Sequence, residues 1–178
     1  MNAFVATIES PAGPFTFATD ERGALIWLQF ADGEYKRTVE QELEREDFSV
    51  EQDEDITAVA RAQLQEYYAR TRQKFDVPFV LTGSEWQKAV WQALTRIPFG
   101  GTRSYAEVAA MVGRPKAARA VGRANATNRL PVVVPCHRVI GADDSLAGFA
   151  GGTYLKTRLL EHEARVLANG SVGPVESV

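Results

Sequence analysis

Cys136 is the only cysteine of the chain, and His137 and Arg138 follow it directly. A thiol attacks carbon as the thiolate, and a neighbouring histidine or arginine favours that ionised form. Because successive side chains of a strand point to opposite faces, Cys136 and His137 can interact only where the chain turns or through a water molecule. A lone cysteine is more often an inert buried residue. The residue types alone therefore leave two interpretations, a nucleophile and a structural thiol.

One cysteine and two histidines restrict the remaining chemistry. A disulfide within the chain needs two cysteines, and a structural zinc site needs about four Cys or His ligands. We therefore expect no metal. No apolar run approaches the roughly 18 to 20 residues that span a bilayer, and the N-terminus has no basic and apolar signal segment. These features predict a cytoplasmic protein that does not contact membranes.

Charge divides the 178 residues unevenly. Residues 1–83 hold 16 acidic and 8 basic side chains, whereas residues 84–165 hold 12 basic and 6 acidic side chains. The division predicts an acidic N-terminal α/β domain over 1–83 and a second domain over 84–165 that suits a polyanion. Residues 166–178 are expected to form a flexible tail. A random fluctuation in surface charge is the alternative interpretation.

The first 83 residues predict a small antiparallel sheet with helices. Apolar runs at 4–8, 15–19 and 24–30 are separated by proline, glycine and charged residues, as in a strand meander. Helical spacing is present at 35–46 and again at 56–71, where it is amphipathic. The acidic segment 51–55 between them is expected to be a mobile connection.

The second part predicts three helices. Ser84 with Gln87, and Ser104 with Glu107, have the spacing of capping boxes. The second helix spans 104–112, and a Gly-Arg-Pro break separates it from a third helix over 116–126. Two short helices around such a turn indicate a helix-turn-helix, with a plain helical hairpin as the alternative.

Small and basic residues make up most of this third helix. The small residues are Ala117, Ala118, Ala120, Gly122, Ala124 and Ala126, and the basic residues are Lys116, Arg119, Arg123 and, just beyond the helix, Arg129. Small side chains allow a close approach of the backbone, and cations pair with phosphates. The helix is therefore predicted to lie against DNA, with little capacity to read base sequence.

The apolar run 130–134 precedes Pro135 and the cysteine. It predicts a buried strand whose end displays the thiol, since reactive groups are commonly carried where an element ends.

The segment Pro135–Ile140 resembles the active-site motif of the O6-alkylguanine-DNA alkyltransferases, the methylated-DNA–protein-cysteine methyltransferases. Further motifs of this family occur in the same order over about residues 84–165, whereas residues 1–83 match only in general character. The further motifs are Trp86–Trp91, Ile97–Gly100, Ser104–Tyr105, Ala118–Gly122, Gly148–Gly152 and Leu159–Glu163.

The resemblance implies an α+β fold, with a ribonuclease-H-like N-terminal domain and a winged-helix-like C-terminal domain that contains the helix-turn-helix. It implies a monomer that binds double-stranded DNA in the minor groove and flips an alkylated guanine out of the helix. The alkyl group is then transferred irreversibly to the protein, without a cofactor. Activity on O4-alkylthymine is left open.

The resemblance also implies residue roles. Cys136 is the alkyl acceptor, His137 is its base through a bound water, and Glu163 orients the histidine. Tyr105 supplies a hydroxyl near the guanine, and Arg119 fills the gap that the flipped nucleotide leaves.

The remaining implied residues hold the hinge, contact DNA or shape the pocket. Asn128 holds the turn after the third helix; Ala117, Ala118 and Arg123 contact DNA; Val139, Gly148, Phe149 and Ala150 form the pocket wall. The chain departs from many relatives at Arg129, where they have proline, and from some at Ala150, where they have serine.

Three other functions fit parts of the sequence. A non-catalytic sensor of alkylated bases would share the fold, but known sensors replace the cysteine. A transcription regulator would use the helix-turn-helix, but the alanine-rich helix offers few side chains for base readout. A cysteine hydrolase would need an oxyanion hole, and no motif indicates one.

Overall fold

A four-stranded sheet forms the N-terminal part of the computed structural model, which describes residues 1–33, 35–146, 149 and 151–170. The strands are β1 (Asn2–Ser10), β2 (Gly13–Thr19), β3 (Leu25–Phe30) and β4 (Ser49–Glu51), in the order β3-β2-β1-β4. The predicted antiparallel meander of the first three strands is confirmed. The fourth strand was not predicted and pairs parallel to β1, so the sheet is mixed.

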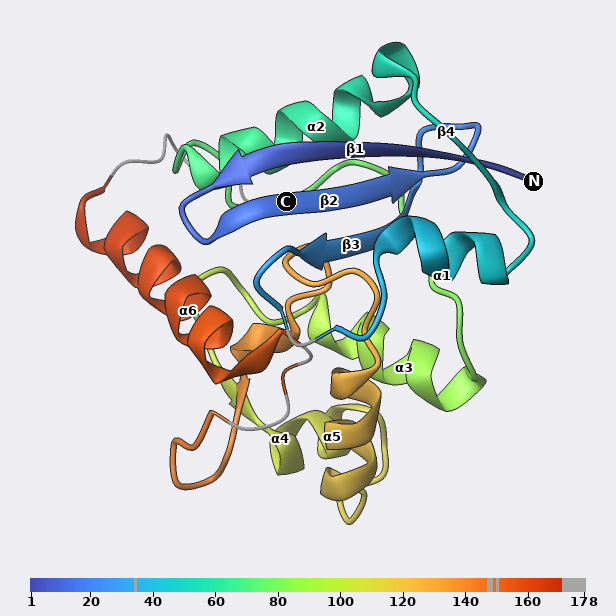
Figure 1. The fold of residues 1–178 in the computed structure, drawn as a ribbon. Helices are drawn as coiled ribbons and strands as arrows, with labels where there is room; N and C mark the ends of the chain where they lie inside the picture. The colour runs from blue at the N-terminus through green and yellow to red at the C-terminus, as the bar shows by residue number, and fades with distance from the viewer. Residues whose placement is uncertain (34, 147–148, 150, 171–178) are drawn as a thin grey trace.

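Alternating burial along the strands places one helix on each face of the sheet (Figure 1). Ala3, Val5 and Ala18 pack with residues of α1 (Val39–Arg45). Phe15 and Phe17 belong instead to the main core, together with the inner side of α2 (Glu54–Tyr68). Because side chains of a strand alternate between faces, this one pattern accounts for both helices.

The acidic segment 51–55 is not the mobile connection that the sequence predicted. Glu51 lies in β4, and α2 begins at Glu54. Asp53 caps the helix, since its carboxylate accepts hydrogen bonds from the backbone N–H groups of Asp55 at 2.9 Å and Ile56 at 3.0 Å. The acidic residues thus suit the positive end of the helix dipole.

The C-terminal part is helical, and the predicted α+β fold is confirmed (Figure 1). It contains α3 (Glu85–Leu94), α4 (Tyr105–Met111), α5 (Ala118–Ala126) and α6 (Gly152–Ala168), with a short parallel pair of β5 (Arg103–Ser104) and β6 (Val139–Ile140). Both predicted capping boxes are present, at the start of α3 and of α4. Gly113, at φ +74°, makes the turn between α4 and α5.

The segment 130–134 is a compact turn, so the predicted strand is wrong. The Val134 N–H donates to Leu130 O at 2.8 Å, and Val132 has a positive φ of +77°. The thiol therefore lies at the start of a short 3₁₀ helix, η1 (Cys136–Arg138). This is the change of direction that neighbouring Cys136 and His137 need in order to face a common site.

One apolar core joins the two parts of the chain, including Phe15 and Leu25 from the sheet and Trp91, Val134 and Leu159 from the C-terminal part. The domain division at residue 83 therefore stays a prediction. The predicted tail begins too early, because α6 continues to Ala168 and Val166 is buried. None of the helices in the described ranges is long and apolar enough to cross a membrane.

Candidate active site around Cys136

The Cys136 thiol is buried, with 1% of the residue exposed. The side-chain amide of Asn128 donates to Cys136 Sγ at 3.1 Å and to Val134 O at 2.8 Å, and its oxygen accepts from the Leu130 N–H at 2.9 Å. Burial raises the pKa of the thiol to about 11, although the Asn128 hydrogen bond and the charge of Lys156 lower it. The thiol is thus neutral near pH 7 and needs a base to become a nucleophile.

His137 and Glu163 form a fully buried pair. The His137 Nε2–Glu163 Oε1 distance is 2.7 Å, and both side chains are 0% exposed. Burial would raise the pKa of Glu163, but His137 and Arg138 outweigh it and hold that pKa well below its usual range. An ionised carboxylate only accepts hydrogen bonds, so His137 Nε2 carries the proton and Nδ1 carries the lone pair. Among the described residues, Nδ1 has no hydrogen-bond partner.

The pKa of His137 is lowered from its ordinary value, because burial penalises the charged ring more than Glu163 favours it. Arg138 and Lys156 also lower this pKa. The imidazole is therefore neutral near pH 7, with its basic nitrogen directed away from the carboxylate. It has the properties of a general base for a nearby thiol.

Glu163 joins four segments of the chain. Its carboxylate accepts hydrogen bonds from the Tyr67 hydroxyl at 3.0 Å, the Gly100 N–H at 2.9 Å and Arg138 Nη2 at 2.8 Å, in addition to His137. Arg138 also donates to Ile97 O at 2.6 Å. The sequence indicated no role for Tyr67, and it indicated Gly100 only as the end of the Ile97–Gly100 motif, because no local pattern relates residues that are 96 and 63 positions from their partner.

Lys156 is, after Arg138, a second buried cation near Cys136, and it was not predicted from the sequence. It lies on α6 seven positions before Glu163, which is two helical turns and therefore the same face. Its ammonium donates to Val139 O and lies 5.8 Å from the centre of the Tyr105 ring. Burial lowers the pKa of Lys156 to about 8, although Cys136 raises it. The helical spacing to Glu163 was the one available signal.

The outer face of α5 presents the predicted DNA contacts. Arg119 and Arg123 are exposed, and Ala117 and Ala118 are half-buried. The inner face is held against α3 by two indole N–H groups.

These indole bonds fix α5 at two points one turn apart. Trp86 donates to Ala120 O at 3.4 Å, and Trp91 donates to Ala124 O at 2.9 Å. The rigid inner face and the cationic outer face suit a helix that presses on a polyanion.

The predicted pocket residues lie at different depths. Tyr105, the first residue of α4, is half-buried, and burial is the main cause that raises the pKa of its hydroxyl. Val139 and Phe149 are buried. Gly148 and Ala150 lie outside the described residues.

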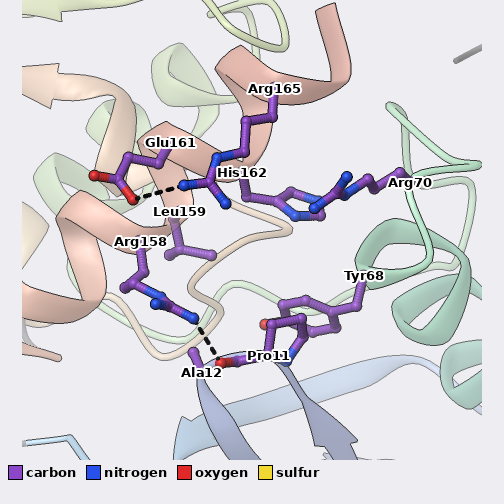
Figure 2. A pocket seen from close by; sticks show the side chains of 9 residues that line it. All are labelled: Pro11, Ala12, Tyr68, Arg70, Arg158, Leu159, Glu161, His162 and Arg165. Atoms are coloured by element: carbon purple, nitrogen blue, oxygen red, sulfur yellow. Dashed lines mark hydrogen bonds and ion pairs between the residues drawn. The ribbon is translucent and has the colours of Figure 1, made fainter. Parts of the chain in front are cut away.

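His162 does not belong to the cluster around Cys136. It lines a separate pocket of about 60 Å³, between α6 and the turn after β1, together with Arg70, Arg158 and Arg165 (Figure 2). His162 Nε2 is 2.9 Å from Tyr67 O. Although His162 and Glu163 are adjacent on α6, they therefore face different sites.

In the described ranges, no group of His, Cys, Asp or Glu could hold a metal ion. The cluster combines a neutral thiol, a neutral imidazole on the next residue whose Nδ1 has no partner among the described residues, and an ionised carboxylate. These are the groups that an activated thiol nucleophile and its base require.

Comparison with known proteins gives consistent matches to both parts of the chain. Residues 85–165 match the family described as 6-O-methylguanine DNA methyltransferase, DNA binding domain, and residues 4–81 match its ribonuclease-like domain. A methylated-DNA–protein-cysteine methyltransferase of Methanosarcina acetivorans is 44% identical over 160 residues, which cover 90% of this chain and 97% of the relative. The constitutive enzyme of that name from Bacillus subtilis is 44% identical over 163 residues, or 90% and 94% of the two chains.

Solved structures agree with the sequence matches. Mycobacterium tuberculosis O6-methylguanine methyltransferase superposes with a TM-score of 0.79 at 38% identity, covering 98% of this chain and 96% of that one. The same organism's OGT in complex with DNA gives a TM-score of 0.78 at 38% identity, with coverage of 92% and 94%.

The fold and the buried cluster thus define an α+β protein whose single cysteine is buried and is followed directly by the histidine of a buried His–Glu pair. The chain belongs to the 6-O-methylguanine DNA methyltransferase family, and the resemblance found in the sequence is confirmed.

Proposed function

We propose that the protein repairs DNA directly, by moving the alkyl group of an O6-alkylguanine onto Cys136 once per molecule. The observation that carries the proposal is the contact between His137 in η1 and Glu163 in α6, because it makes a buried, oriented base of the residue that directly follows the only cysteine of the chain. The names of the similar proteins, methylated-DNA–protein-cysteine methyltransferases, support the same reaction.

In the proposed reaction, Sγ of Cys136 forms a bond to the alkyl carbon while the bond from that carbon to O6 breaks. The bonding electrons go to the guanine. The thiol proton passes through a water to Nδ1 of His137, and one proton is returned to the guanine, which leaves unmodified. The product is a thioether, which ordinary cellular reductants do not reverse, so no second turnover follows.

The surrounding charges favour this proton transfer. Glu163 stabilises the imidazolium that forms when His137 takes the proton, and it holds Nε2 in place at 2.7 Å. Lys156 lowers the pKa of Cys136 by its charge and so favours the developing thiolate. Burial makes both effects stronger than they would be in water.

DNA binding is assigned to the outer face of α5. Arg119 and Arg123 are exposed there, and Arg119 is proposed to fill the gap left by the flipped nucleotide. Flipping a base costs a few kcal/mol, and phosphate contacts of the basic C-terminal part offset that cost. Binding in the minor groove, action as a monomer and a cytoplasmic location are further parts of the proposal.

The test is the mass of the intact protein after incubation with duplex DNA that contains one O6-methylguanine. We expect a gain of one methylene group, about 14 Da, on Cys136, limited to one per molecule. Cys136→Ala should show no gain. Tight binding to the lesion without a mass change would indicate the alternative function, a sensor of alkylated bases.

A further inference from the structure

Arg129 anchors the turn after α5 to the N-terminal part of the protein. Its Nη1 and Nη2 donate to the two carboxylate oxygens of Glu46 at 2.8 and 2.5 Å. Its guanidinium lies 4.3 Å from the centre of the Trp27 ring. A guanidinium that is paired at two N–H groups and stacked on an aromatic face is fixed in direction as well as position.

The backbone of Arg129 is held by the same surface. Arg129 O accepts a hydrogen bond from the Leu28 N–H at 2.8 Å. Leu28 belongs to β3, an edge strand of the sheet, whose outer backbone groups pair with segments outside the sheet: Leu25 bonds to Pro78 and Val80, and Leu28 bonds to Arg129. In Figure 1, β3 is the strand of the sheet that lies nearest to α3 and α5, with α1 at its side.

Arg129 also stands between the two residues that hold the thiol turn. Asn128 before it donates to Cys136 Sγ at 3.1 Å, and Leu130 after it donates its N–H to Asn128 Oδ1 at 2.9 Å. A shift of the Arg129 backbone therefore moves the Asn128 amide relative to the sulfur. The contact of Asn128 with the sulfur depends on angle and distance, as any hydrogen bond does.

We propose that Glu46, Trp27 and the edge of β3 form a junction lock on Arg129, through which the N-terminal part positions the Asn128 amide against Cys136. Arg129 is thus a positioning residue, and the acidic sheet domain is a component of the active site. The inference rests on the proposed function only in taking Cys136 as the nucleophile.

The charge distribution supports this lock. The N-terminal part is acidic and the C-terminal part is basic, and Glu46–Arg129 is an ion pair that directly joins them. The two side chains are 30% and 35% exposed, so solvent screens this pair less than the more exposed pair of Glu161 and Arg165 on α6. The pair serves here to fix the position of Arg129, because an ion pair on the surface contributes little to the free energy of unfolding.

The experiment measures how fast iodoacetamide, a small neutral alkylating agent, modifies the single thiol at pH 8. At a pH below the thiol pKa, the rate is proportional to the thiolate fraction, which the Asn128 hydrogen bond increases. Arg129→Ala and Glu46→Gln should slow the reaction by about threefold to tenfold, as expected for weakening one hydrogen bond to a charged sulfur. Transfer from alkylated DNA should slow by the same factor.

The matched control is Glu66→Gln on α2, which removes the same kind of charge from an ion pair with Arg72 at 2.6 Å and lies outside the lock. This variant should react like the wild type. Arg129→Lys keeps the charge but loses the paired N–H groups, so its rate should lie between wild type and Arg129→Ala.

A purely structural role would have the opposite effect, because loosening the fold exposes the thiol and speeds its reaction. Unchanged or faster modification in both Arg129→Ala and Glu46→Gln would overturn the lock. The readout needs no DNA, so a wild-type protein that fails to transfer alkyl groups would overturn the proposed function and leave this result valid. If Arg129→Ala does not fold, the milder Glu46→Gln decides.

Discussion

Replacing Glu163 with glutamine tests the buried charge on which the proposed mechanism depends. Glutamine keeps the shape of the side chain but has only one acceptor oxygen, whereas both oxygens of Glu163 accept hydrogen bonds. In either orientation, the new NH₂ group faces donors, either Gly100 and Arg138 or Tyr67 and His137. Arg138 also loses its buried counter-ion, and breaking such a pair costs about 3–5 kcal/mol.

The effect on activity follows from His137. Glu163 raises the pKa of that histidine, so its loss leaves a weaker base and a less stable imidazolium. General-base catalysis contributes about 100-fold or more, and we expect the rate of alkyl transfer to fall by about that factor. Single-turnover transfer from DNA with a radiolabelled methyl group measures the rate, and urea unfolding measures the stability.

Glu161→Gln is the matched control, because it makes the same change on the same helix. Glu161 has a side chain that is 52% exposed and lies 3.8 Å from Arg165. Its replacement should change stability by less than about 0.5 kcal/mol and leave the rate unchanged. The reasoning would be refuted if Glu163→Gln matched this control in both measurements.

The stability difference should also depend on pH. The pKa of Glu163 is lowered in the folded protein, so its contribution is complete above the unfolded value of about 4.3 and is lost as pH falls below it. The gap between wild type and Glu163→Gln should therefore narrow in acid. A constant gap would indicate that the carboxylate is not ionised in the fold.

Two further predictions concern the base and the DNA contact. Burial lowers the pKa of His137, so the transfer rate should stay constant as the pH falls to about 6.5, the ordinary histidine pKa, and should decrease only at lower pH. A stopped-flow pH profile of the rate with its midpoint above pH 6.5 would contradict the assignment of His137 as the base. Arg119→Ala should slow transfer from duplex DNA but not from the free base O6-methylguanine, because Arg119 is exposed on α5 and has no assigned part in the chemistry. The intact mass of the protein, followed over time, measures both rates. Equal slowing with both substrates would place Arg119 in the reaction instead.

Local interactions explain what the sequence predicted well. The capping boxes of Ser84 with Gln87 and Ser104 with Glu107 are formed within one helical turn, so their spacing alone identifies them. The meander of the first three strands is likewise set by short turns. The Cys136–His137 motif and Glu163 were found through the family resemblance, and the structure brings His137 and Glu163 into contact.

Interactions between distant segments explain what the sequence did not predict. The run 130–134 has the composition of a strand, but hydrogen bonds within the turn and from Asn128 override that preference. Strand β4 is three residues long and depends on a parallel partner, β1, that is distant from it in the sequence. A lysine is rarely buried, so the sequence favours a surface position for Lys156, whereas the structure buries it. Only its spacing from Glu163 along α6 could have indicated that it is buried.

The four-way hydrogen bonding of Glu163 has a consequence for folding kinetics. Its bonds span 96 residues to Tyr67, 63 to Gly100 and 26 to His137, so they form only after long loops have closed. The entropy lost in closing these loops is offset only when three segments have come into contact: α2, α6, and the turn that follows α3. The catalytic arrangement should therefore appear together with the cooperative folding of the whole chain and not as a locally stable unit. A partly folded molecule would carry the same cysteine without the base that we propose activates it.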